Sequence, residues 1–291
     1  VAGNHTDVHR ATERIGHAVS PDGVTWTRNP QPVLMPGPAG SWDRGYVAAP
    51  HVIYHNGLYR MWYRGAADLT TLDGAAIGYA TSPDGVTWTR QGAGPVLSPA
   101  GGATWDANIL WSASVLPDAT GYRMWYSGCR CLGTCAAIQC RIGLATSPDG
   151  LSWTRHPANP VLGLGPTGSW DAGTTYFPSV VPSVTAAGSL EMWYTGYGVT
   201  GVHIGHATSP DGVTWTRDPA NPVIRAGQSP AWDSGEVFAP SVVPVPGAGM
   251  GQVSYRMWYT GSANFIYRIG LAQGRLVEFD NHVLLPLVSR N

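Results

Sequence analysis

One sequence unit of about 63 residues recurs along this chain of 291 residues, and this repetition constrains the fold more than any other feature. The segment IGHAVSPDGVTWTR at 15–28 returns with small changes at 77–90, 142–155 and 204–217, and a degraded copy begins at Ile269. A Trp-Asp pair recurs at 42–43, 105–106, 170–171 and 232–233, and a Met-Trp-Tyr triplet recurs at 61–63, 124–126, 192–194 and 257–259. Such a chain is expected to fold as a series of similar structural units.

Each unit contains four short runs rich in β-branched and aromatic residues, and Gly, Pro and Asp bound these runs. The first run follows the Trp-Asp pair, the second contains Met-Trp-Tyr, the third is the Ile-Gly-x-Ala-x-Ser run, and the fourth starts at Trp-Thr-Arg. No segment shows a sustained helical period. Four antiparallel strands in a unit of this length predict an all-β fold made of β-propeller blades.

The number of copies predicts a five-bladed β-propeller of four-stranded antiparallel blades in a single domain, 1–291. A partial blade is expected at 1–35, and complete blades are expected at about 42–98, 105–163, 170–226 and 232–291. The inner half of the incomplete blade has three candidate sources, which are residues 1–14, the C-terminal HVLLPLV, and sequence outside this chain. A strand from a second copy is one such source, so an oligomer is a possible outcome.

The composition excludes several classes of function. The formal net charge is -1, and only 12% of residues are charged, which argues against a nucleic-acid partner. All 17 positive charges are arginines, so Schiff-base chemistry and a phosphate-loop lysine are excluded. No apolar run is long enough to span a membrane, and the first ten residues carry no signal-peptide pattern.

Four cysteines lie close together in the sequence, between positions 129 and 140. They flank and fill the loop between the second and third strands of one blade, so the strand ends bring Cys129 and Cys140 together. We predict a Cys129–Cys140 disulfide with a Cys131–Cys135 disulfide inside it. A zinc site is the alternative, although the spacing lacks the usual two-residue knuckles. Clustered cysteines, 13 tryptophans and few charges are typical of a secreted or cell-surface protein.

Two repeated motifs carry eight of the 18 acidic residues, and we interpret both motifs as structural. Ser-Pro-Asp-Gly suits a tight turn, because Pro presets its φ, Asp bonds its own backbone and Gly accepts a positive φ. The segment resembles the Asp-box of sialidases but is one residue shorter. The alternative, a metal or sugar site, concerns the turn aspartates Asp22, Asp84, Asp149 and Asp211. The Trp-Asp aspartates are expected to cap the turn that enters each blade.

The whole unit, Trp-Asp, then Pro-Ser-Val, Tyr-x-Met-Trp-Tyr-x-Gly, Ile-Gly-x-Ala-x-Ser-x-Asp-Gly and Pro-Val-Leu, resembles the five-bladed propeller glycosidases. These include arabinanases, β-xylosidases, invertase-like fructosidases and mannoside phosphorylases. The resemblance implies that acidic residues at the mouth of the inner strands hydrolyse glycosidic bonds. It also allows a calcium ion in the central channel, held through a histidine, while no other cofactor or metal is expected.

The variable loops that join the second and third strands share one face with the entry to the first strand, and we place the site there. Glu236 is the candidate catalytic carboxylate because it is the only acidic residue outside the repeated motifs at the start of an inner strand. Asp7 and Asp68 are the candidate partners, and Glu13 and Asp73 are the alternatives to them. The resemblance usually implies three carboxylates on different blades. The candidate substrate-binding residues are Trp111, Tyr46, Tyr176, Phe238, Arg64 and His51.

Two of these candidates have a structural alternative. Trp111 is the one tryptophan outside the repeated motifs, so it is either a sugar-stacking platform or a residue that fills space between blades. His51 stands where the other blades have serine, and a hydrogen-bonded core histidine is the alternative for it.

Three candidate functions arise from these observations. The first is a secreted glycoside hydrolase that acts on a plant or microbial polysaccharide or oligosaccharide. The second is a non-catalytic carbohydrate-binding or surface-adhesion propeller, with aromatic platforms and arginines but no carboxylate pair. The third is a structural repeat that assembles by strand exchange. A carbohydrate is the expected partner in the first two cases.

Overall fold

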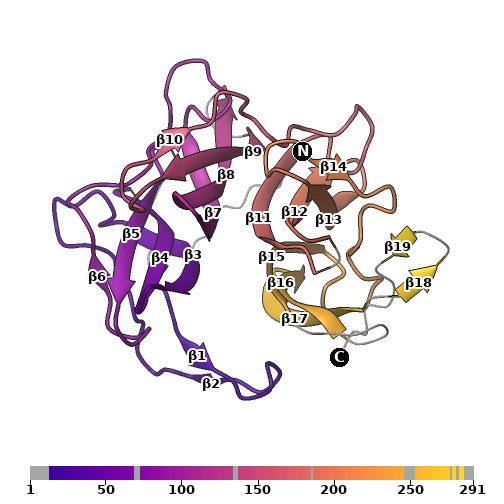
Figure 1. Ribbon diagram of the computed structural model, residues 1–291, viewed down its shortest axis with the longest axis horizontal. Helices are drawn as coiled ribbons and strands as arrows, with labels where there is room; N and C mark the ends of the chain where they lie inside the picture. The colour runs from indigo at the N-terminus through magenta and orange to yellow at the C-terminus, as the bar shows by residue number, and fades with distance from the viewer. Residues whose placement is uncertain are drawn as a thin grey trace. The chain divides into compact units, whose positions relative to one another are not determined.

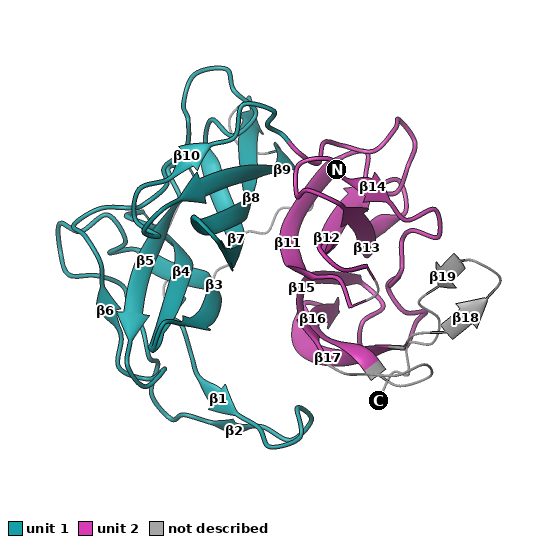
Figure 2. Cartoon of the chain, in the orientation of Figure 1, with its two compact units in different colours: residues 1–160 teal, residues 161–291 magenta. Residues whose placement is uncertain are grey.

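The computed structural model describes residues 13–68, 73–133, 137–184, 186–245, 253–275, 277–279 and 282–284, and these residues form strands, turns and loops without a helix (Figure 1). No membrane-spanning helix occurs in the described part of the chain. The chain divides into two compact units, residues 1–160 and 161–291 (Figure 2), and each unit is described by itself.

The first unit contains two four-stranded antiparallel sheets and one two-stranded sheet. One sheet has the order β3 (Tyr46–His55), β4 (Leu58–Ala66), β5 (Ala76–Ser82) and β6 (Thr89–Arg90). The next has the order β7 (Ile109–Asp118), β8 (Gly121–Leu132), β9 (Ala137–Ser147) and β10 (Thr154–Arg155). The small sheet pairs β1 (Ala18–Val19) with β2 (Thr27–Arg28).

The second unit repeats the same pattern. One sheet has the order β11 (Thr174–Pro182), β12 (Leu190–Gly198), β13 (Gly201–Ser209) and β14 (Thr216–Arg217). The next sheet has three strands, β15 (Glu236–Pro244), β16 (Val253–Ala263) and β17 (Ile266–Arg275). A separate pair joins β18 (Val277–Phe279) and β19 (His282–Leu284). The all-β prediction and the blade pattern are therefore confirmed.

The described residues form four blades, not the five that the copy number predicted. The β1–β2 pair corresponds to the outer half of a blade, because Ala18 pairs with Arg28 as Ala80 pairs with Arg90 in the first full sheet. The inner strands of that incomplete blade are not among the described residues. Counting copies of the outer strands gave one blade more than the described residues form, since only an outer pair of that blade is described. The prediction of a single domain spanning 1–291 stays a prediction.

A buried aspartate from the Trp-Asp pair joins the parts of each blade. In the second sheet, Asp106 Oδ2 accepts hydrogen bonds from the Tyr126 hydroxyl at 3.0 Å and from Arg155 Nε at 2.8 Å. The tyrosine belongs to the second strand and the arginine to the fourth, so one carboxylate ties the blade entry to both. We call this arrangement the clasp, and it recurs as Asp43, Tyr63, Arg90 and as Asp171, Tyr194, Arg217. The structural interpretation of the Trp-Asp motif is confirmed, although the aspartate bonds side chains of two strands as well as lying in a turn.

Two glycines per blade leave room for the tryptophan of the same motif. A Cβ on Gly128 would lie 2.4 Å from Asp106 Cβ and 2.6 Å from the Trp105 ring. A Cβ on Gly143 would lie 2.7 Å from the same ring. The repeated glycines of the second and third strands are therefore required by close packing of the indole, since real Cβ atoms do not approach so closely.

The Ser-Pro-Asp-Gly turns are closed by their own side chains. Asp84 Oδ1 accepts the backbone N–H of Val86 at 2.8 Å and of Thr87 at 2.7 Å, and Trp88 Nε1 donates to Gly85 O at 3.0 Å. The same bonds recur in the other three copies of the turn. These backbone hydrogen bonds hold the pKa of Asp22 at about 2. The turn aspartates therefore serve as turn-forming residues, as predicted.

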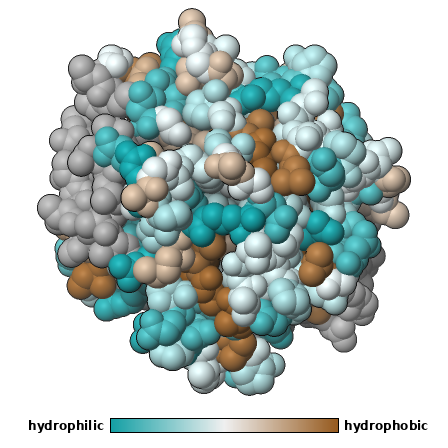
Figure 3. Space-filling view, turned by 90° about the vertical axis from the view of Figure 1, so that its left-hand side faces the viewer, coloured by the Kyte–Doolittle hydropathy of each residue, from teal (hydrophilic) through white to brown (hydrophobic). Residues whose placement is uncertain are grey.

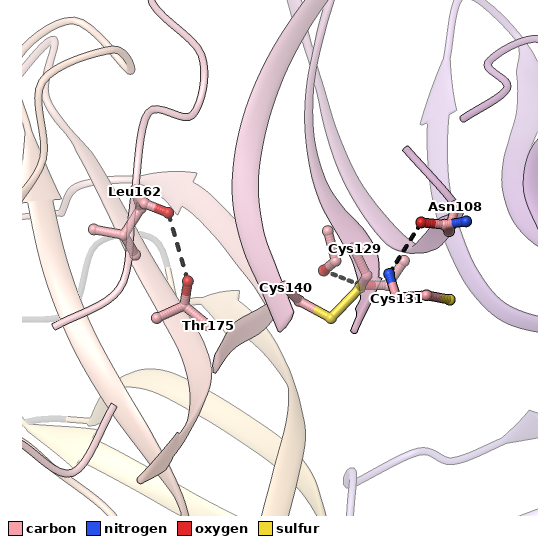
Figure 4. Close-up of a disulfide and its surroundings, with 8 residues drawn as sticks. Asn108, Cys129, Cys131, Cys140, Leu162 and Thr175 are labelled. Atoms are coloured by element: carbon pink, nitrogen blue, oxygen red, sulfur yellow. Dashed lines mark hydrogen bonds between the residues drawn. A yellow bond between two sulfur atoms is a disulfide. The ribbon is translucent and has the colours of Figure 1, made fainter. Parts of the chain in front are cut away.

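The predicted Cys129–Cys140 disulfide is present (Figure 4). The two cysteines are directly opposite each other in the antiparallel β8–β9 pair, which explains why the bond forms there. Cys131 is also disulfide-bonded, and its predicted partner Cys135 lies outside the described residues. Cys129 and Cys140 are consumed in a disulfide, so the zinc alternative is wrong for them. Asn108 Oδ1 accepts the Cys131 N–H at 3.0 Å and thereby fixes this hairpin to the entry of its blade.

The surface visible in Figure 3 is mostly hydrophilic, with apolar residues in several separate patches. Some of the large exposed apolar side chains belong to the outer turns, among them Trp26, Val86 and Leu151. Scattered apolar residues of this kind are normal for a protein surface.

The third blade contains a buried ionic cluster that sequence reasoning did not predict. Glu191 accepts hydrogen bonds from the hydroxyls of Ser183 at 2.6 Å and Tyr255 at 2.5 Å, and its other oxygen lies 3.0 Å from His206 Nε2. His206 Nδ1 lies 3.3 Å from Asp218 Oδ2. Burial opposes the charged form of His206, but its bonds to both carboxylates raise its pKa overall. Burial likewise opposes the charged form of Glu191, and the bonds to His206, Ser183 and Tyr255 lower its pKa overall.

Replacing the clasp aspartate tests its structural role. We expect Asp106→Asn to lower the free energy of unfolding by roughly 3 kcal/mol, because Arg155 and Tyr126 then lose a buried charged partner. Asp118→Asn is the matched control, since its pair with Arg123 is 3.5 Å long and both side chains are 26% exposed. That control should change stability by less than about 1 kcal/mol. Equal losses in the two variants, measured by chemical denaturation, would show that the clasp is not a main stabilising feature.

The ionic cluster predicts a pH dependence of stability. The His206 pKa is raised, so its contribution is complete below the unfolded value of 6.5 and is lost as the pH rises through the folded value. The pKa values of Glu191 and Asp218 are lowered, so their contributions are complete above the unfolded values of 4.5 and 3.8 and are lost at lower pH. We therefore expect the stability gap between the wild type and His206→Gln to be larger near pH 5.5 than near pH 8.5. Denaturant midpoints at both pH values measure this gap, and a gap independent of pH contradicts the assignment.

Candidate functional site

The inner strand of each blade bends just after its first three residues. In β15 the pairing register shifts between Phe238 and Ser241, and β3, β7 and β11 shift at the equivalent position. In three of the four strands the next residue has a positive φ without being glycine, with values of 46° at Ala49, 50° at Phe177 and 51° at Ala239. Such bulges and strained residues are common at binding sites because they redirect side chains. The candidates Trp111, Tyr176 and Phe238 lie at these bends.

In the second unit the predicted carboxylate lies at the entry of its strand. Glu236 is the first residue of β15 and pairs with Ser262 in β16, which in turn pairs with Tyr267 in β17. The Ser262 hydroxyl donates to Glu236 Oε1 at 3.2 Å. Three neighbouring strands therefore place a carboxylate, a hydroxyl and an aromatic ring side by side.

Four aromatic rings continue from this point across two blades. The ring centroids of Tyr176 and Phe177 are 4.9 Å apart, those of Phe177 and Phe238 are 6.1 Å apart, and those of Phe238 and Tyr267 are 6.1 Å apart. We call these four residues the aromatic row. Burial and the negative charge of Glu236 together raise the pKa of the Tyr176 phenol, which places this carboxylate close to the row. Aromatic faces beside a carboxylate suit a ligand that carries C–H faces and polar groups.

In the first unit the candidates meet around an arginine. The guanidinium carbon of Arg64 lies 5.3 Å from the Tyr46 ring centroid and 4.7 Å from the Trp111 ring centroid. Arg64 Nη2 lies 3.4 Å from Glu13 Oε2. We call these four residues the arginine cluster. It joins β3, β4 and β7 to the segment before β1, and cation–π contact holds the guanidinium between two rings.

Trp111 has a different environment from the other tryptophans of its blade. The core cluster of this blade includes its neighbours Leu110, Ala113 and Val115, with Trp105 and Trp153 packed against it. Trp111 is half-buried and is not part of that cluster. This placement agrees with a binding role for its ring, with one part of the ring in contact with Arg64.

The remaining candidates, His51, Asp68 and Asp7, belong neither to the aromatic row nor to the arginine cluster as the structure describes them. His51 Nε2 lies 3.0 Å from Val115 O in the neighbouring blade, and burial lowers its pKa to about 4. Ser179, at the equivalent position, also bonds across to the next blade, since its Oγ accepts the Val242 N–H at 2.9 Å. His51 thus has the contacts of the core alternative. Asp68 is exposed in the loop after β4, and Asp7 lies outside the described residues.

The calcium ion that the sequence resemblance allows stays a prediction. The described residues contain no group of three or more His, Cys, Asp or Glu side chains that could hold a metal ion. Calcium needs six to eight oxygen ligands. The candidate histidine, His51, has its Nε2 engaged with a backbone carbonyl.

Sequence reasoning missed two residues of these clusters as candidates. Phe177 stands where the other blades have Ala49, Ser112 and Ala239, so a comparison of the repeats could have found it. Tyr267 belongs to a variable hairpin with no repeat to compare. Glu13 was a possible partner carboxylate by sequence, and only the folded chain shows that it reaches Arg64.

The chain is similar to known proteins in both sequence and structure. Residues 43–176 match the family model of the glycosyl hydrolases family 32 N-terminal domain. Two uncharacterized proteins from two strains of Mycobacterium tuberculosis are 33% identical over 194 residues, which is 64% of this chain and 58% of theirs. The chain therefore spans 58% of the length of these relatives. The A type blood N-acetyl-α-D-galactosamine deacetylase of Flavonifractor plautii is 27% identical over 119 residues, or 39% of this chain and 15% of that protein.

Among solved structures, a protein described as a glycoside hydrolase superposes with a TM-score of 0.70 at 19% identity, covering 94% of this chain and 81% of that one. The Bombyx mori family 32 β-fructofuranosidase gives a TM-score of 0.60 at 16% identity, covering 79% and 46%. A family 117 glycoside hydrolase from Zobellia galactanivorans gives 0.59 at 18% identity, covering 78% and 65%.

These likenesses confirm that the fold is the β-propeller of the propeller glycosidases, as the sequence resemblance predicted. The match to the family 32 N-terminal domain covers fewer than half of the residues of this chain.

The two interpretations of Trp111 give different results on truncation. For a binding residue, Trp111→Ala should weaken carbohydrate binding about tenfold or more and change the free energy of unfolding by less than about 1 kcal/mol. Trp105→Ala is the matched control, because its indole packs on the glycines of the same blade and its loss should cost about 3–5 kcal/mol. A screen of oligosaccharides by calorimetry, with thermal unfolding in parallel, measures both. A large loss of stability with unchanged binding would identify Trp111 as a packing residue.

Proposed function

We propose that this chain is a carbohydrate-active protein and acts as a glycoside hydrolase through carboxylates at the mouth of its inner strands. The observation that carries the proposal is the position of Glu236 at the entry of β15, beside the aromatic row, in a fold shared with glycosidases. Plant or microbial polysaccharides and oligosaccharides are the proposed substrates.

In this proposal Glu236 transfers a proton to the glycosidic oxygen as the bond between that oxygen and the anomeric carbon breaks. Water supplies the hydroxyl that the anomeric carbon gains, and a second carboxylate accepts the proton that this water loses. The aromatic row binds the apolar faces of the sugar rings and orients the bond toward Glu236. The Ser262 hydroxyl, which donates to Glu236 Oε1, holds the carboxyl group in position.

The identity of the second carboxylate stays a sequence-based prediction, with Asp68 and Asp7 as its candidates. Asp68 lies in an exposed loop on the side of the blade where the variable loops gather, which leaves it accessible to a substrate. Asp7 belongs to the segment before β1. Glu13 is a weaker choice because it already contacts Arg64.

A secreted or cell-surface location is proposed with this function. The Cys129–Cys140 disulfide supports it, because disulfides persist in oxidising compartments.

A non-catalytic carbohydrate-binding propeller is the second candidate function. The arginine cluster favours it, because the half-buried Trp111 ring lies against a guanidinium whose one carboxylate neighbour is already paired. In this case the protein binds sugars through the same face without turnover.

Replacing Glu236 tests the catalytic proposal. We expect Glu236→Gln to lower the rate of oligosaccharide hydrolysis by roughly 100-fold or more, because the amide cannot donate the proton that a carboxylic acid supplies. Its melting temperature should stay near that of the wild type, since the side chain is at the entry of the strand. Release of reducing ends from a polysaccharide panel measures the rate, with Asp118→Asn as a control that keeps full activity.

Full activity in Glu236→Gln would remove this residue from the mechanism. A wild-type protein that binds an oligosaccharide from the panel but never hydrolyses it would instead establish the non-catalytic function.

A further inference from the structure

Arg64 occupies a position where the repeat does not require an arginine. The residue after Met-Trp-Tyr is Ser127, Thr195 or Thr260 in the other three blades. There the hydroxyls make hydrogen bonds to neighbouring strands, such as the one between Ser112 and Ser127 at 2.8 Å and the one that Thr195 accepts from the Ala239 N–H at 3.0 Å. Blade formation therefore needs only a small hydroxyl side chain at this position.

The arginines that the repeat does require are well supplied with acceptors. In each clasp, Nε of the arginine lies 2.7–2.9 Å from a buried aspartate, and Nη2 donates to a backbone carbonyl at 2.5 Å. These structural arginines are Arg90, Arg155 and Arg217.

Arg64 differs from them in burial and in bonding. It is 8% exposed, and its Nε and Nη1 are buried without a hydrogen-bond partner among the described residues. Its contact with Glu13 is long, at 3.4 Å, and the Glu13 side chain is 34% exposed. A buried guanidinium with unused donors carries a free-energy cost, and such groups in native proteins call for a functional explanation.

The surroundings of Arg64 suit one kind of ligand. A guanidinium binds a carboxylate through two parallel N–H···O bonds, and here Nη2 and Nε could form that pair if the weak contact with Glu13 is released. Tyr46 and Trp111 flank the guanidinium, and an indole face matches the C–H face of a sugar ring. A hexuronic acid carries both a carboxylate and such a face.

We propose that Arg64 is a specificity-determining residue that binds the carboxylate of a uronic acid unit, and that this carboxylate displaces Glu13. The inference rests on the proposed carbohydrate function and narrows its substrate class to acidic glycans. Glu13 then acts as an internal anion that keeps the guanidinium neutralised while no ligand is bound.

Binding of simple sugars tests the charge requirement. The probes are glucuronic acid and galacturonic acid, with glucose and galactose as uncharged matches, and galactose 6-sulfate and inorganic phosphate as other anions. We expect the uronic acids to bind at least about tenfold more tightly than their neutral matches by calorimetry. Equal binding of neutral and acidic sugars overturns the proposal, and so does a preference for phosphate or the sulfated sugar over the uronic acids.

Variants of the cluster test the assigned residues. Arg64→Thr introduces the residue of two other blades and should remove the preference for uronic acids, while Arg64→Lys should keep part of it. Glu13→Gln should tighten uronic acid binding several-fold, because the competing internal anion is gone. Arg44→Thr, at an exposed arginine of the same unit, is the control and should bind as the wild type does.

A loss of uronic acid binding in Glu13→Gln overturns the displacement of Glu13, because a purely structural ion pair gives that result. Glu236→Gln should still bind uronic acids while its hydrolytic activity is lost. If the protein prefers neutral sugars, and if this binding is lost in Trp111→Ala but kept in Arg64→Thr, the inference is contradicted. The proposed carbohydrate function is unaffected by that result. If the wild type neither binds nor hydrolyses any carbohydrate, both proposals fail together.

Discussion

The buried carboxylate of the Trp-Asp pair is the interaction on which the rest of each blade depends. Asp106 accepts one hydrogen bond from the second strand and one from the fourth. A single carboxylate therefore links the segment that enters the blade to both of these strands. The indole beside it requires glycines on the two adjoining strands. These demands explain why so much of the sequence repeats with little change.

In the sheet of β15, β16 and β17, the described residues include the aspartate and tyrosine of the clasp but no clasp arginine. Asp233 accepts the Tyr259 hydroxyl at 3.2 Å, and no fourth strand is described beside β17. Ile269 is 77% exposed there, whereas Ile77, Ile142 and Ile204 are fully buried at the same repeat position. The fourth strand and the segment after it therefore complete the hydrophobic core of a blade as well as its hydrogen bonds.

Function in such a protein is expected at the residues that depart from the repeat. Once the clasp and the turns account for the repeated side chains, Arg64, Trp111 and Glu236 remain as departures from the repeat. Each lies near the bend of an inner strand, where a bulge turns side chains away from the sheet. A rigid scaffold with variable residues at one end is a common arrangement for binding sites.

The sequence predicted the parts of this structure that depend on local pattern. The strand order follows from the alternation of apolar and polar residues, and the closed turns follow from their turn residues. The Cys129–Cys140 pair follows from the antiparallel hairpin, whose strand ends lie opposite each other. The contact between Glu13 and Arg64 joins residues 51 positions apart, and no local rule predicts it. The Glu191–His206 pair was not predicted. Glu191 stands where the other blades have an arginine, and only the folded core shows which histidine it contacts.

We propose that the residues that build the blades are distinct from the residues that bind the ligand, and one variant tests that separation. Arg64→Thr, Trp111→Tyr and Glu236→Thr together restore residues found at the same positions in other blades. The decisive measurement is the melting temperature of this triple variant alongside its binding to the oligosaccharides that the wild type binds. We predict a melting temperature within a few degrees of the wild type and loss of binding. Retained binding, or a protein that no longer folds, would contradict the separation.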